Sequence, residues 1–263
     1  MNLCLLGPLW GDICGVPYEF YPERDPACLD LAHPRQTFSD DSILTLAVAK
    51  AIVEGRPYAE TIFELATRYP DAGWGGRFRS LWVVGRDPRP YGSFGNGAAM
   101  RVAPVGWAFD TVADVLAQAE ASAACSHDHP KGIEIAQATA LAVFLARKGQ
   151  DKEEIRDALE ERFGWNLSLT LPEIREQALR DGFDETWKSV PPAIGVFLNT
   201  VDFTDCLRQT IALGCDADTQ ACISCAVAEA YYGPDEALLP RVLAHLDKPL
   251  ARILEAFCGK FGV

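Results

Sequence analysis

The chain has 263 residues and a net charge of −13 at pH 7. This charge would repel the phosphates of DNA or RNA, so nonspecific nucleic-acid binding is not expected. Apolar residues make up 49% of the chain, yet no uninterrupted apolar run reaches the roughly 18 residues of a membrane span. The apolar start, "MNLCLLGPLWGDICG", lacks the basic segment of a signal peptide, so we expect a cytoplasmic protein.

Helical periodicity recurs from the first third of the chain to its end. Apolar residues in 42–54 fall on one helix face, and Gly55 follows as a stop signal. The further predicted helices are 111–124, 131–148, 152–162, 204–213, 218–232, 235–246 and 249–259. Two long segments, 71–106 and 164–192, are predicted to be irregular. Because period-2 alternation and linkers are missing, the sequence predicts an all-α fold with one compact domain over residues 1–263.

The nine cysteines include one Cys-x-x-Cys pair, Cys222 and Cys225. Its flanks, "TQACISCAVAEAYY", have the composition of an Ala-rich helix interior. No second pair and no nearby histidine completes a zinc pattern. We therefore expect the pair to pack in the core, with a redox or zinc role as the alternative.

Three stretches place carboxylates beside glycines or hydroxyls. They are "GDICGVPYEF" with Asp12 and Glu19, "TFSDDSILT" with Ser39, Asp40 and Asp41, and "GCDADTQA" with Asp216, Asp218 and Thr219. The last two stand where a loop enters an apolar helix. Such residues are good helix caps, and acids complement the dipole of a first turn. They are also the oxygen ligands that Mg²⁺ prefers, so capping and metal binding both remain open.

Two other stretches are candidates for ligand contact. "GSFGNGAAMR", residues 92–101, is rich in glycine, which lets the backbone approach a phosphate; an ordinary turn is the alternative. "CSHDHP" places His127 and His129 before Pro130. It fits either a polar helix entry or a hydrogen bond to a ligand, because no zinc-ligand spacing is present.

Taken in order, these motifs resemble the ADP-ribosylglycohydrolase family, which includes the dinitrogenase-reductase-activating glycohydrolase. The motifs are "GDICGVPYEF", "FSDDS", "GSFGNGAAMR", "SHDHP" and "GCDADTQACISCAVAEAYYG", and they span most of the chain. The resemblance implies an all-α, orthogonal helical domain with two Mg²⁺ ions, or Mn²⁺, in a cleft.

The resemblance also assigns expected roles by position. The implied metal ligands are Ser39, Asp40, Asp41, Asp216, Asp218 and Thr219. Glu19 and Asp41 are the implied catalytic residues, and Asp12 is expected to be structural. The implied substrate-binding residues are Ser93, Phe94, Gly95, Asn96, Gly97, Ala98 and His127. One departure concerns Cys215, which stands where the family usually has glycine; a positive φ there would disfavour cysteine.

The implied function is metal-dependent hydrolysis of the glycosidic bond between ADP-ribose and an acceptor on a protein or small molecule. We expect the metals to orient the distal ribose and a water, and Glu19 to act as general acid/base. The alternatives are an ADP-ribose- or nucleotide-binding protein without hydrolysis, and a hydrolase of another metabolite such as O-acetyl-ADP-ribose. Acceptor choice is expected to depend on the loops around the cleft, 71–92 and 164–192.

Overall fold

The computed structural model describes residues 2–182 and 186–263, and over these residues the fold is all-α. No β-strand occurs among them, although one isolated antiparallel bridge joins Gly95 to Thr186. This confirms the fold class predicted from the sequence. Residues 183–185, part of a segment predicted to be irregular, lie outside the described residues.

The fold is built from helices that follow one another in this order along the chain. They are α1 (Leu6–Glu19), α2 (Asp40–Glu54), α3 (Tyr58–Arg68), α4 (Gly76–Phe78), the π-helix η1 (Arg79–Val84), α5 (Gly97–Met100), α6 (Ala103–Ala108), α7 (Val112–Ala124), α8 (Pro130–Arg147), α9 (Lys152–Phe163), α10 (Leu171–Asp181), the 3₁₀ helix η2 (Trp187–Ser189), α11 (Val190–Asn199), α12 (Phe203–Ile211), α13 (Ala217–Tyr232), α14 (Leu238–His245) and α15 (Lys248–Phe261).

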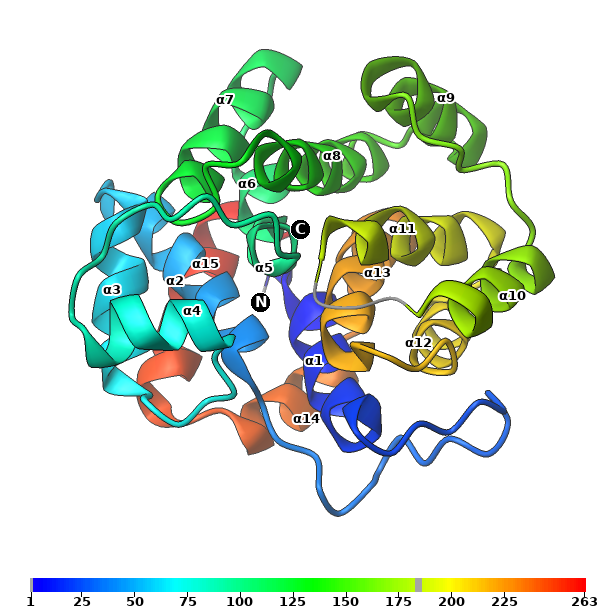
Figure 1. Ribbon diagram of the computed structural model, residues 1–263, viewed down its shortest axis with the longest axis horizontal. Helices are drawn as coiled ribbons and strands as arrows, with labels where there is room; N and C mark the ends of the chain where they lie inside the picture. Colours follow the sequence, from blue (N-terminus) through cyan, green and yellow to red (C-terminus); the bar gives the residue numbers. More distant parts are fainter. Residues whose placement is uncertain (1, 183–185) are drawn as a thin grey trace.

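Helices α1 and α13 pack against each other near the middle of the molecule (Figure 1). Three glycines of α1, at positions 7, 11 and 15, form a stripe with a spacing of four residues. A Cβ atom on any of them would lie only 2.3–2.4 Å from a backbone atom of α13. Only glycine permits this approach, so the stripe brings the backbones of the two helices into close contact.

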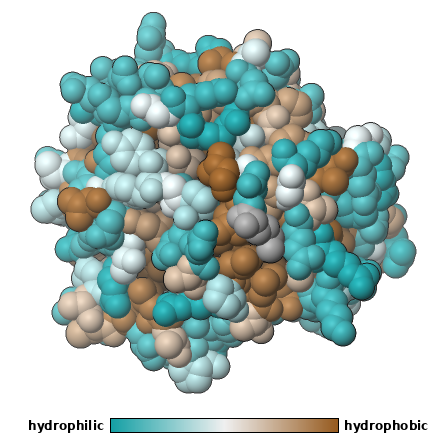
Figure 2. Space-filling view, turned by 180° about the vertical axis from the view of Figure 1, so that it is seen from behind, coloured by the Kyte–Doolittle hydropathy of each residue, from teal (hydrophilic) through white to brown (hydrophobic). Residues whose placement is uncertain are grey.

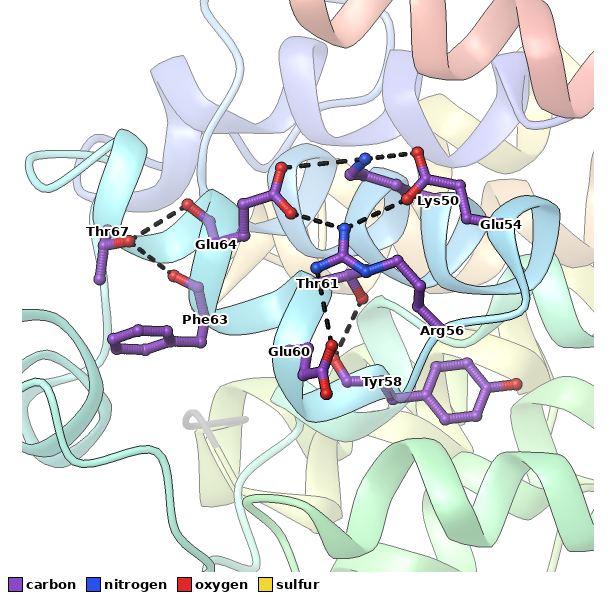
Figure 3. Close-up of polar contacts among 9 residues, drawn as sticks. All are labelled: Lys50, Glu54, Arg56, Tyr58, Glu60, Thr61, Phe63, Glu64 and Thr67. Atoms are coloured by element: carbon purple, nitrogen blue, oxygen red, sulfur yellow. Dashed lines mark hydrogen bonds and ion pairs between the residues drawn. The ribbon is translucent and has the colours of Figure 1, made fainter.

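Helix α2 starts and ends with the signals read from the sequence. Ser39 caps it by accepting a hydrogen bond from the Asp41 backbone N–H at 3.2 Å, and Gly55 ends it with φ 65°. Arg56 then joins α2 to α3, because its guanidinium lies 3.2 Å from Glu54 and 2.8 Å from Glu64 (Figure 3). These ion pairs are on the surface, so they orient the two helices more than they stabilise them.

The sequence did not predict four helices of at least ten residues, which are α1, α3, α10 and α11. Helix α1 holds three glycines and two prolines, which lower helix propensity, but it is buried almost all round and packing overrides propensity. Helix α3 was not predicted either; it begins directly after Pro57, which stands at its N-cap. The prediction that 164–192 is irregular was wrong, because it contains α10 and the start of α11. A capping box, Thr170 with Glu173, marks the start of α10.

The segment 71–106 was predicted to be irregular and is so only in part. It contains the short helices α4, η1, α5 and α6, joined by extended stretches. Their brevity follows from the eight glycines and several prolines in this segment, which interrupt helices after a turn or two. The segment therefore supplies short helices instead of one long helix, and its last part, with α5 and α6, is buried.

The cysteine pair of α13 lies in the core, and the surface is mostly polar. Cys222 and Cys225 are both buried within α13, as expected for core residues, and the Cys222 thiol donates to the Met100 carbonyl at 3.3 Å. The face seen in Figure 2 is largely hydrophilic, with apolar residues scattered over it and gathered near its middle. No helix in the described part of the chain has the length and apolar character needed to cross a membrane.

Candidate functional site

A cavity of about 580 Å³ opens between the ends of α1, α2, α13 and the glycine-rich loop. Nearly all of the site residues expected from the sequence line it. They are Glu19, Ser39, Asp40, Asp41, Ser93, Phe94, Gly95, Asn96, Gly97, His127, Asp216, Asp218 and Thr219. The exception is Ala98, which is fully buried in α5 behind the wall.

Five carboxylates meet in two groups that share one member. Asp12, Asp41 and Asp218 each offer an oxygen, and these three oxygens lie within 4.8 Å of one another. Glu19 and Asp216 form a second group with Asp218 under the same limit. The close packing of α1 on α13 explains the meeting, because the Cβ of a residue at Gly15 would lie 2.3 Å from the Asp218 Cα.

Asp12 holds the start of α2 against α1. It is buried, and its carboxylate accepts hydrogen bonds from the Ser39 backbone N–H at 3.0 Å and the Ser39 hydroxyl at 2.7 Å. It also accepts from the Ser42 backbone N–H at 3.1 Å and from the Ser42 hydroxyl. With both oxygens engaged, Asp12 has the structural role expected for it, and it also lies closer to the other carboxylates than the sequence indicated.

Asp41 differs from Asp12 because only one of its two carboxylate oxygens accepts hydrogen bonds. Its Oδ2 accepts from the hydroxyls of Ser39 at 3.1 Å and Thr219 at 3.2 Å. Its Oδ1 is buried and has no hydrogen-bond partner among residues 2–182 and 186–263. A buried carboxylate oxygen without a donor is costly, and a cation would remove that cost. Together with the hard oxygen donors around it, this orphaned atom shows that the site fits a divalent metal ion.

The electrostatics of the group lead to the same inference. Burial, followed by repulsion from neighbouring carboxylates such as Asp12 and Asp216, raises the pKa of Asp40 and Asp41 well above the usual value. Burial and the charge of Asp41 do the same to the pKa of Asp218. Clustered carboxylates of this kind are stable as anions only beside a cation.

The loop that carries Asp216 is strained. Gly214 and Cys215 have φ values of 70° and 64°, and a left-handed conformation is unfavourable for cysteine. This is the difficulty predicted from the sequence for a positive φ at Cys215. The loop nevertheless closes on the site, because the Asn96 side-chain amide donates to Asp216 Oδ2 at 2.6 Å and to the Ser189 hydroxyl at 3.1 Å. Asn96 thus links the glycine-rich loop to the carboxylates.

His127 lies beside the glycine-rich loop, next to Gly97. It is buried, and its Nδ1 lies 2.8 Å from the Ser126 hydroxyl. Burial and then the nearby Arg101 cation lower its pKa well below the usual value, so the imidazole is neutral. A Cβ atom at Gly97 would lie 3.2 Å from His127 Nε2, so a side chain at this position would crowd the imidazole.

Several residues that line the cavity come from the segment after α3 and were not predicted from the sequence. Asp71, Arg77 and Tyr91 all line the cavity. The segment had been singled out as a loop that borders the cleft, but no spacing pattern pointed to these individual side chains. From 164–192, the other segment singled out, Thr186 is the described residue that lines the cavity.

Comparison with known proteins now adds to this geometry. The sequence profile of the ADP-ribosylglycohydrolase family matches residues 3–261. The chain belongs to the ADP-ribosylglycohydrolase family. Membership indicates a glycohydrolase and confirms the resemblance drawn from the ordered motifs.

Curated members of the family extend over almost the whole chain. This chain is 27% identical to the proteins named ADP-ribosylhydrolase ARH3 from Bos taurus and Homo sapiens, over 89% of this chain and 85% of each relative. A solved structure described as an ADP-ribosylglycohydrolase-related protein complex superposes with a TM-score of 0.68 at 23% identity. The superposition covers 97% of this chain and 95% of that one, which establishes a shared fold.

Proposed function

We propose that this ADP-ribosylglycohydrolase family member is a metal-dependent hydrolase that releases ADP-ribose from an acceptor on a protein or a small molecule. The observation that carries the proposal is the meeting of Glu19, Asp41, Asp216 and Asp218 in a cavity that the glycine-rich loop also lines. An ADP-ribosyl group needs both features, because it has a reacting sugar and, further along, a diphosphate.

The metal site would be built from residues of two helix starts. Ser39, Asp40 and Asp41 come from α2, and Asp216, Asp218 and Thr219 come from α13. We propose that they hold two Mg²⁺ or Mn²⁺ ions. When bound, such ions supply positive charge that orients sugar oxygens and acidifies water. The orphaned Asp41 Oδ1 supports this assignment.

Glu19 is the proposed general acid/base. It is the last residue of α1, it is half-buried, and it lines the cavity beside Asp216 and Asp218. Cleavage of a glycosidic bond builds oxocarbenium-like charge on the sugar and requires a proton to move between water and the leaving group. The Glu19 carboxylate would accept the proton from the attacking water and deliver it to the departing acceptor atom.

The glycine-rich loop would bind the middle and far part of the ligand. All five residues from Ser93 to Gly97 line the cavity, and Gly95 and Gly97 have no side chain to keep a ligand from the backbone. Neutral His127 would offer a hydrogen bond rather than a charge. The ring of Phe94, 47% exposed and lining the cavity, would stack on a planar base.

An assay of ADP-ribose release tests the function directly. The protein is incubated with an ADP-ribosylated peptide and Mg²⁺, and with an excess of EDTA in parallel. We expect release that EDTA abolishes. Binding of ADP-ribose without release would instead identify a binding protein. A panel of differently linked substrates, including O-acetyl-ADP-ribose, identifies the acceptor.

The Glu19→Ala variant tests the assignment of the acid/base. It should retain ADP-ribose binding and lose turnover by about 10²- to 10⁴-fold, the usual contribution of such a group. Glu23→Ala is the matched control, because Glu23 follows α1 but does not line the cavity. Normal turnover in Glu19→Ala would refute the role given to this carboxylate.

A further inference from the structure

The charges that line the cavity are very unequal. Its acidic lining residues are Glu19, Asp40, Asp41, Asp71, Asp216 and Asp218. Arg77 is the sole lysine or arginine among the described residues that line it. An anionic ligand therefore meets repulsion everywhere except near bound metal ions and near Arg77.

Arg77 stands beside the glycine-rich loop. Its guanidinium carbon lies 5.1 Å from the centre of the Tyr91 ring, and Tyr91 immediately precedes Gly92 in the chain. The Tyr91 ring in turn lies 6.0 Å from the His127 ring. Stacking of this kind orients the plane of a guanidinium and leaves its N–H edges available for a ligand.

The backbone that carries Arg77 lines the cavity from Asp71 onward. A Cβ atom at Gly73 would lie 3.6 Å from Asp40 Oδ1, so this segment begins beside the carboxylates. Four residues later it reaches Arg77 and the Tyr91 ring. Arg77 is exposed and forms no ion pair or hydrogen bond within residues 2–182 and 186–263, whereas nearby Arg89 is paired with Asp87 at 3.0 Å.

We propose that Arg77 binds the diphosphate of the ligand and makes the cavity selective for glycosides that carry a nucleoside diphosphate. This inference rests on the proposed function and adds a specificity-determining residue to it. A guanidinium matches the oxygens of a phosphate with two parallel N–H donors, which a lysine cannot reproduce. The carboxylates with their metal ions would then take the sugar, and Arg77 the charged part of the ligand.

Calorimetric titration of the Mg²⁺-loaded protein with ADP-ribose and with ADP tests the proposal. Arg77→Gln should weaken the binding of both ligands by about 10- to 100-fold, the effect of losing a charge-assisted contact, because both carry the diphosphate. Arg77→Lys should recover part of the loss. Arg79→Gln is the matched control, since Arg79 lies two residues further on, is exposed, and does not line the cavity.

The outcomes separate this inference from the proposed function. Unchanged affinity of Arg77→Gln for ADP-ribose would overturn the inference and leave hydrolysis by the wild type untouched. Weakened binding of ADP-ribose but not of ADP would also overturn it, because the contact would then be to the distal ribose. A third outcome is that Arg77→Gln binds both ligands more weakly while the wild-type protein binds ADP-ribose but never cleaves the substrate. This result would support the contact between Arg77 and the diphosphate and refute the hydrolase function. Failure of the wild type to bind ADP-ribose would overturn both.

Discussion

Replacing Gly11 by alanine tests whether the close packing of α1 on α13 builds the carboxylate site. The new Cβ would lie 2.4 Å from the Ala221 carbonyl oxygen and 2.6 Å from its carbon. Both are backbone atoms in the middle of a buried helix, so neither can rotate away as a side chain would. To restore an ordinary contact distance the two helices must move apart by about 1 Å.

The expected cost follows from that displacement. Overpacking of a tightly packed core costs about 1–3 kcal/mol, partly offset by up to about 1 kcal/mol of helix propensity gained by alanine. For a chain of this size each kcal/mol lowers the melting temperature by about 2–4 °C. Because Gly11 adjoins Asp12 and lies between Glu19 and the start of α1, the carboxylates move as well. A misplacement near 1 Å at a reacting centre lowers turnover by about 10²-fold.

Two measurements and one control complete this test. Thermal unfolding with and without Mg²⁺ reports on stability and on the metal site, and release of ADP-ribose reports on turnover. Gly259→Ala is the matched control, because Gly259 lies in helix α15 and a Cβ there meets nothing within 4 Å. Alanine should stabilise that position slightly. The reasoning is refuted if Gly11→Ala behaves like Gly259→Ala in melting temperature, Mg²⁺ response and turnover.

Three further changes probe other parts of the structure. Glu229 is buried in α13 and accepts a hydrogen bond from the Leu6 backbone N–H at 2.9 Å; burial raises its pKa from 4.5 to about 8. Glu229 binds its proton more tightly in the folded protein than in the unfolded chain. Protonation of Glu229 therefore stabilises the fold fully below pH 4.5, and this stabilisation is lost as the pH rises to about 8. Glu229→Gln should therefore remove a slope of up to about 1.4 kcal/mol per pH unit in that window, measured by urea unfolding of both proteins; parallel curves would contradict this. Cys215→Gly should relieve the φ of 64° and raise stability by up to about 1 kcal/mol without loss of the Mg²⁺ response, and a lower melting temperature would show that the cysteine contacts outweigh the strain. Asp218→Asn removes the carboxylate shared by both groups, so the rise in melting temperature on adding Mg²⁺ to EDTA-treated protein should disappear; an undiminished rise would place the metal elsewhere.

Much of the fold was predictable because many of its helices carry their own boundary signals. Ser39 and Gly55 delimit α2, and Pro130 opens α8, so local residues and apolar periodicity placed both helices correctly. Helix α1 shows where such reasoning fails. Its glycines and prolines are unfavourable for an isolated helix, and what stabilises it is contact with α13, more than 200 residues away in the sequence.

In the candidate site, the acidic residues could be predicted from the sequence, whereas Arg77 could not. The acidic residues stand in short motifs, and the ordered motifs located Glu19, Asp41, Asp216 and Asp218, which the structure brings together. Arg77 belongs to no such motif. It reaches the cavity because the segment after α3 folds back past Asp40 toward Tyr91, and that path depends on tertiary contacts that no local spacing encodes.

Ser39 shows that capping and metal binding are compatible at one residue. Its hydroxyl accepts from the Asp41 backbone N–H, which is the cap, and it donates its single proton toward Asp12 at 2.7 Å or Asp41 at 3.1 Å. A hydroxyl oxygen has two lone pairs, so one remains after the cap has formed. Because Asp12 also holds Ser42 and the Ser39 backbone, the hydroxyl is fixed in direction before any ion binds. The helix start that first resembles an ordinary cap therefore supplies the rigidity that a metal ligand requires.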